Sequence, residues 1–145
     1  MNHKFNNERN MKNSTNDHKE TTTNTVSSNR TVLLLQRGEI ERFNKEVALI
    51  PRDSRILLAW TDLRKLDLRG ANFKGAFLSG ADLSGCDLRG VDFTDAVLYK
   101  TNFYGVDLTD ARGLSGEQLF RAVGLDSATL PPGATDLDST LPKPF

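Results

Sequence analysis

The sequence predicts an all-β solenoid, built from stacked turns of a short repeat, and two observations support this fold class. Residues 61–110 divide into ten consecutive units of five residues, and the central residue of every unit is Leu or Phe. A period of five matches neither the α-helix nor the flat strand, so the backbone must turn once in each unit. Repeats of this kind bury their core against the units above and below them.

The central residues supply the predicted core of the solenoid. If each unit is one side of a square coil, four units close a turn of twenty residues, and residues twenty apart stack at a spacing of about 4.7–4.9 Å. Two places before the central residue, most units have a small residue such as Ala71 or Cys86, as a narrow interior requires. Glycine ends many units, where it can adopt a positive φ in the turn. The central residues then form four apolar columns: Leu63, Leu83 and Phe103; Leu68, Leu88 and Leu108; Phe73 and Phe93; and Leu78 and Leu98.

The units between residues 66 and 90 closely resemble the pentapeptide repeat family. They read L-D-L-R-G, A-N-F-K-G, A-F-L-S-G, A-D-L-S-G and C-D-L-R-G. The resemblance implies a right-handed quadrilateral β-helix, here of about three coils, with short α-helical caps at both ends. Residues 111–122 resemble the short helix that closes such repeats, and residues 33–44 resemble a lead-in found in many bacterial members. We therefore expect a bacterial protein.

Composition and the positions of helix-capping and helix-breaking residues divide the chain into five predicted segments. The first thirty residues contain eight Asn and few apolar side chains, so they cannot bury enough surface to fold. A helix is expected from near Arg30 to Pro51, and Gly38 can divide this helix into two pieces. A second helix is expected from a cap at Ser115 to Ala122. The segments are a disordered tail (1–29), a helical N-terminal cap (30–55), the repeats (56–112), a C-terminal helical cap (113–132) and a flexible tail (133–145).

The residues that catalysis requires are missing from the predicted folded body. The only histidines, His3 and His18, lie in the predicted tail, so neither can be held as a base or a metal ligand. Cys86 takes a small inward position, where it acts as a buried apolar residue. We therefore expect no enzyme activity, no metal and no cofactor.

Charge separates two candidate functions. The whole chain has 19 basic and 19 acidic residues, and residues 61–110 have eight Asp against six Lys or Arg. Some long, acidic pentapeptide repeat proteins imitate duplex DNA, which carries one charge per about 1.7 Å. A DNA mimic directed at a topoisomerase, DNA gyrase, is therefore our alternative function, but Arg69 and Arg89 can neutralise the column of Asp67, Asp87 and Asp107. The same carboxylates argue against nucleic acid as a partner.

Targeting signals are also missing from the sequence. No apolar run of signal-peptide length follows a basic start, and no stretch approaches the eighteen apolar residues of a membrane span. A single cysteine fits a reducing compartment. We expect a cytoplasmic protein that does not bind membranes.

The repeat departs from its own pattern on one face. The second residue of each unit is Asp or Asn in eight of ten units, and the exceptions are Phe77 and Val97. Leu57 completes their column if the register extends backward, and Tyr99 lies on the same side. We call these four residues the apolar face. They predict a protein-binding site, because such a surface requires a cover.

Two kinds of cover can shield the apolar face. One lies within the chain, either the helix from about Thr31 to Leu49 or the tail after Pro132, and we favour it. The other is a partner protein or a second copy that forms a homodimer. The predicted function is a non-catalytic protein–protein interaction module or adaptor.

Overall fold

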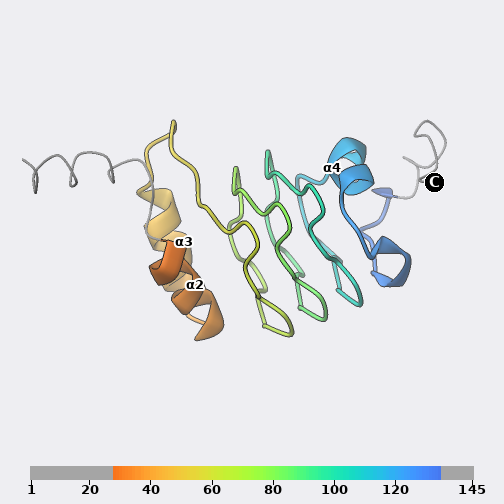
Figure 1. Cartoon of the computed structure of the whole chain (residues 1–145), viewed down its shortest axis with the longest axis horizontal. Helices are drawn as coiled ribbons and strands as arrows, with labels where there is room; N and C mark the ends of the chain where they lie inside the picture. The colour runs from red at the N-terminus through yellow and green to blue at the C-terminus, as the bar shows by residue number, and fades with distance from the viewer. Residues whose placement is uncertain (1–27, 135–145) are drawn as a thin grey trace, which may run out of the picture.

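The computed structural model describes residues 28–134 as a stack of backbone turns with helices at both ends (Figure 1). Helices α2 (Ser28–Gln36) and α3 (Ile40–Ala48) lie at the N-terminal end. Helix α4 (Gly116–Arg121) and the 3₁₀ helix η1 (Leu125–Ser127) lie at the other end. Helix α2 begins two residues before the predicted start of the cap at residue 30. The rest of the predicted N-terminal tail, residues 1–27, and residues 135–145 lie outside the described part.

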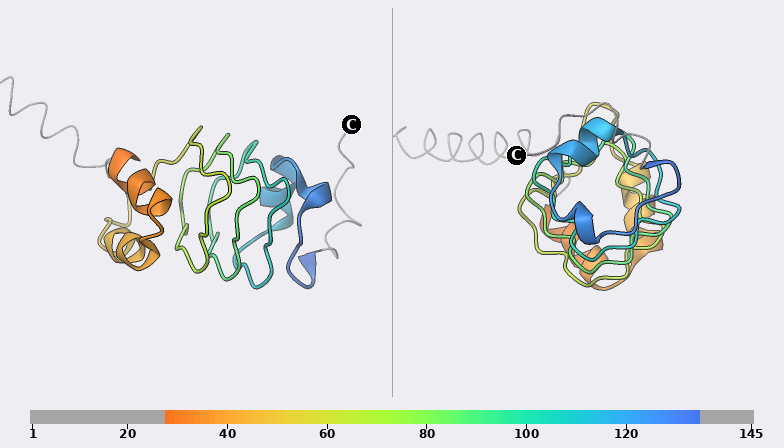
Figure 2. Two further views of the ribbon diagram at one scale, coloured as in Figure 1. Left: turned by 90° about the horizontal axis from the view of Figure 1, so that it is seen from below. Right: turned by 90° about the vertical axis from the view of Figure 1, so that its right-hand side faces the viewer.

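Between residues 57 and 112, parallel β-bridges join residues that are twenty apart, which is the predicted register. Viewed along its long axis, the stack of turns forms a closed ring (Figure 2). All the β pairing between described residues consists of isolated bridges, so no regular strand accompanies the predicted all-β class. Because the backbone turns once in five residues, one residue per side can bridge to the next turn. The bridged columns are Leu57, Phe77 and Val97; Asp62, Asp82 and Asn102; Asp67, Asp87 and Asp107; and Asn72, Asp92 and Arg112.

The interior matches the four predicted apolar columns. All ten central residues of the repeats are buried, and so are the small residues two places earlier, from Ala71 to Thr101. The Sγ of Cys86 donates to the carbonyl of Leu63 at 2.8 Å, and the hydroxyl of Thr101 donates to the carbonyl of Leu78 at 2.9 Å. These contacts leave neither polar atom unpaired inside the stack.

The fifth residue of every unit takes a left-handed backbone conformation, whether or not it is glycine. Gly80 has a φ of 68°, and Lys65 and Asp95 have φ values of 58° and 57°. Where the second residue of a unit is Asp or Asn, its side chain stabilises the turn by accepting a hydrogen bond from the backbone N–H of the fourth residue. Asp82, for example, accepts from the N–H of Ser84 at 3.0 Å. The repeat therefore imposes the turn even where a side chain costs about 1 kcal/mol or more in this conformation.

The N-terminal helices close the end of the stack. Gly38, with a φ of 71°, separates α2 from α3. Phe43 of α3 is fully buried, and its ring meets that of Phe73 edge-on, with the ring centroids 5.6 Å apart. Asn44 donates to the carbonyl of Gly70 at 3.0 Å and accepts from the N–H of Asn72 at 2.8 Å. Helix α3 thus extends the interior column and pairs with the open edge of the first turn.

The C-terminal helix has the cap that the sequence predicts. The hydroxyl of Ser115 accepts from the N–H of Gln118 at 3.3 Å, and the Gln118 side chain accepts from the N–H of Ser115 at 2.7 Å. Leu119 of this helix is buried, whereas Phe120 and Val123 are 44% and 46% exposed. Val123 bridges to Asn102, in a column of outward-facing residues, and this explains its exposure.

Candidate interaction surface

The apolar face is built by backbone pairing across three successive turns. Leu57 bridges to Phe77, and Phe77 bridges to Val97. The N–H of Leu58 donates to the carbonyl of Phe77 at 2.9 Å, and the N–H of Leu78 donates to the carbonyl of Val97 at 3.0 Å. The three side chains therefore stand in register at strand spacing, about 4.8 Å from one turn to the next.

The apolar face is partly open to solvent. Leu57 is 38% exposed and Tyr99 is 47% exposed, whereas Phe77 and Val97 are half-buried. The ammonium of Lys100 lies 5.3 Å from the centroid of the Tyr99 ring, within the range of a cation–π contact. An aromatic ring with one exposed side and a neighbouring cation is typical of residues that contribute strongly to protein interfaces.

Trp60 extends this surface, a placement that the repeat pattern alone did not reveal. The backbone N–H of Trp60 donates to the carbonyl of Ser79 at 3.0 Å. The indole ring lies directly over Gly80, where a Cβ would clash with the ring. Trp60 is 74% exposed. The backbone N–H of Gly80 in turn donates to the carbonyl of Tyr99 at 2.9 Å. The twenty-residue register that places Trp60 above Gly80 was the available signal.

The helix that we favoured as a cover for this surface lies elsewhere. Helix α3 contacts Gly70, Asn72 and Phe73, and Figure 1 shows both N-terminal helices at the end of the stack. The prediction that the helix near Ile40 and Phe43 lies across the apolar face is therefore wrong. Phe43 finds a better site in the interior, where it continues the column of stacked rings. The tail after Pro132 lies mostly outside the described residues.

A ladder of alternating charges runs along another column of the stack, as the sequence predicted. Asp67 accepts from the guanidinium of Arg69 at 2.6 Å, and Asp87 accepts from that of Arg89 at 2.6 Å. Arg69 lies 3.7 Å from Asp87 as well, so each cation reaches two carboxylates. The side-chain hydrogen bond from Arg69 lowers the pKa of Asp67 to about 2. We call these four residues the charge ladder, in which arginines neutralise the acidic column.

The free thiol of Cys86 is buried inside the stack. Burial raises the pKa of the Cys86 thiol to about 11, so it stays protonated at neutral pH. The described residues include no group of three or more His, Cys, Asp or Glu side chains that could hold a metal ion. None of the helices in the described part is long and apolar enough to cross a membrane.

Comparison with known proteins identifies the repeats. The family model for pentapeptide repeats matches residues 54–90 and 78–112, with eight copies of the repeat. No curated protein matches the sequence. All four members of the apolar face lie within the matched residues. Residues 54–112 of this chain are therefore pentapeptide repeats.

Proposed function

We propose that this chain is a non-catalytic protein–protein interaction module that binds a partner through the apolar face. The observation that carries the proposal is the column of Leu57, Phe77 and Val97, at places where the repeat otherwise has Asp or Asn, with Tyr99 on the same side. Leu57 and Tyr99 are exposed, and Trp60 lies beside them. Tryptophan and tyrosine are the residues most enriched among those that dominate binding energy.

We further propose that the repeats form a right-handed quadrilateral β-helix of about three coils. The twenty-residue spacing of the parallel bridges and the four buried columns support this architecture. Such a scaffold is rigid because each turn is bonded to its neighbours, so the apolar face is already formed before a partner binds. Pre-organisation of this kind reduces the entropy lost on binding.

Affinity capture with a matched pair of variants tests the proposal. The immobilised wild-type chain, a Phe77→Asp/Val97→Asp variant and a Tyr104→Asp control are exposed to a lysate of the source organism, and the captured proteins are quantified. Tyr104 is a suitable control because it is 62% exposed and occupies the same place in its unit as Tyr99, but on the next side of the coil. We expect the wild type and the control to capture the same partner, and the double variant to lose it. Equal capture by all three proteins would overturn the proposal.

Self-association is measured with the same three proteins. If the partner is a second copy, the wild type and the Tyr104→Asp control sediment as a homodimer, whereas the double variant sediments as a monomer. A second copy and a different protein would both bind the apolar face, so sedimentation and capture together identify which of the two is the partner. The cytoplasm remains the compartment that we propose for this interaction.

A DNA mimic directed at DNA gyrase remains the alternative. Such a mimic needs an extended negative face, and the pairing of Asp67 with Arg69 and of Asp87 with Arg89 weighs against one here. Inhibition of gyrase supercoiling by the wild type that persists in the Phe77→Asp/Val97→Asp variant would favour the alternative.

A further inference from the structure

A groove separates the end of α3 from the first turns of the repeat. It encloses about 630 Å³, which is within the usual range for small-ligand sites. Val47, Ile50 and Ile56 form part of its wall. The remaining lining residues are polar, charged or small: Pro51, Arg52, Ser54, Arg55, Asn72, Lys74, Gly75 and Asp95.

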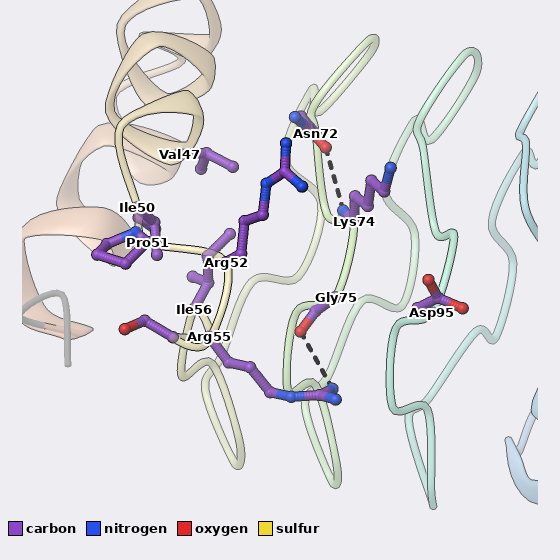
Figure 3. A pocket seen from close by; sticks show the side chains of 11 residues that line it. Val47, Ile50, Pro51, Arg52, Arg55, Ile56, Asn72, Lys74, Gly75 and Asp95 are labelled. Atoms are coloured by element: carbon purple, nitrogen blue, oxygen red, sulfur yellow. Dashed lines mark hydrogen bonds between the residues drawn. The ribbon is translucent and has the colours of Figure 1, made fainter. Parts of the chain in front are cut away.

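Three cations line the groove against one carboxylate, so its lining carries a net charge of plus two (Arg52, Arg55 and Lys74 against Asp95). In Figure 3 the side chains of Arg52 and Lys74 extend toward the same side of the groove as Asn72, while Arg55 lies at the opposite rim. Arg55 donates to the carbonyl of Gly75 at 3.4 Å. None of the three cations forms an ion pair with another residue of the described part.

These unpaired cations contrast with the arginines of the charge ladder. Arg69 and Arg89 occupy the fourth place of their units, and each binds the Asp two residues before it. Lys74 occupies the same place, but Asn72 stands where the carboxylate would be. The Asn72 side-chain oxygen accepts from the N–H of Lys74 at 3.1 Å, which leaves its NH₂ group as a further donor at the groove. Asn72 thus preserves the turn without a carboxylate in the same unit, and Lys74 acts on Asp92 of the next turn through space rather than in a close ion pair.

Three features oppose a negative ligand. Asp95 contributes one negative charge, and the carbonyl end of α3 contributes a partial one. Asp92, in the turn after Asn72, interacts with Lys74, but Arg112 also acts on this carboxylate. The N–H groups of Leu49 and Ile50 donate to the carbonyls of Glu46 and Val47, both at 3.1 Å, and this offsets part of the helix charge. The three cations therefore determine the sign of the field in the groove.

We propose that this groove binds a phosphate group, free or as a phosphate ester, through Arg52, Lys74 and Asn72. A phosphate carries a charge of about −1.5 to −2, which matches the net charge of the lining, and its oxygens can accept from several donors at once. A carboxylate has one negative charge and would leave half of the lining charge unbalanced. This site is separate from the apolar face, and its test does not depend on the proposed partner.

A titration of the ¹⁵N-labelled full-length chain with inorganic phosphate, at constant ionic strength and against chloride, tests the assignment. We expect saturable shifts of the amides of Lys74, Gly75 and residues 52–56. An Arg52→Gln/Lys74→Gln variant should bind phosphate at least tenfold more weakly, since each charge-assisted hydrogen bond contributes about a factor of ten. The matched control is Arg69→Gln/Arg89→Gln, which removes the same charge from the ladder and should leave the affinity unchanged.

Parallel titrations with phosphoserine and with acetate define the ligand. Binding of phosphoserine as well as inorganic phosphate would assign the groove to phosphate esters, and binding of inorganic phosphate alone would assign it to the free ion. Acetate binding as tight as that of phosphate would overturn the proposal. So would unsaturable shifts, or an equal loss of affinity in the two double variants, because either result would indicate a general attraction of anions to the surface.

Discussion

Replacing Leu88 by Ala tests the register of the repeat in its middle turn. Leu88 is fully buried between Leu68 and Leu108, which are also fully buried. The turns on either side are held by backbone hydrogen bonds, from the N–H of Leu68 to Asp87 at 3.0 Å and from the N–H of Leu88 to Asp107 at 3.0 Å. Because these bonds fix the spacing, the neighbours cannot collapse into the cavity. We expect a loss of about 2–5 kcal/mol in the free energy of unfolding, toward the upper part of that range.

The adjacent Asp87→Ala variant is the control for this prediction. The Asp87 carboxylate points outward and binds Arg89 at 2.6 Å. An exposed ion pair of this kind contributes about 1 kcal/mol or less. Urea denaturation, with equal m-values confirming a common unfolding transition, measures both variants. Equal losses for Leu88→Ala and Asp87→Ala would refute the assignment of the first side chain to the core and the second to the surface.

Three further predictions concern the turns, the charge ladder and the N-terminal segment. Gly80→Ala should displace the Trp60 ring and shift the fluorescence of this single tryptophan, whereas Gly75→Ala, with a similar φ and nothing within 4 Å of a new Cβ, should leave the emission unchanged; unchanged emission in both variants would contradict the packing of Trp60 on Gly80. Arg69→Gln should raise the pKa of Asp67 from about 2 toward its ordinary value, as measured by carboxyl ¹³C NMR. Since the folded pKa is lowered, the contribution of this pair to stability is present above about pH 4 and is lost as the pH falls toward 2, and a pKa that does not move would argue against the pairing. Deletion of residues 1–27 should leave the melting temperature nearly unchanged, because that segment lacks apolar anchors, and a large fall would show that it contributes to the core.

The repeat could be predicted closely from the sequence because its constraints are local and periodic. A five-residue period with Leu or Phe at its centre determines which side chains face inward, and Leu88 and Phe93 are buried as expected. The left-handed turns could be predicted at glycines, but Lys65 and Asp95 show that the turn is imposed by the coil itself.

The caps could be predicted as helices at the two ends of the stack, but their contacts could not be predicted. Their contacts join residues far apart in the chain, such as Phe43 with Phe73 and Asn44 with Gly70, and no period specifies such contacts. The helix near Phe43 was therefore expected over the apolar face, although it fits the end of the stack. The basic groove was missed for a similar reason, since Arg52 and Lys74 meet only once the N-terminal cap is placed.

The central claim is that the apolar face lies outside the core and is free to bind a partner. The free energy of unfolding of a Phe77→Asp variant tests this claim most directly. Phe77 loses its contacts with Leu57 and Val97, which contribute about 0.2–1 kcal/mol for each cross-strand pair, so we predict a loss of at most about 2 kcal/mol. A loss of 4 kcal/mol or more, about the effect of burying an unpaired charge, would show that another part of the chain covers the face and would contradict the account.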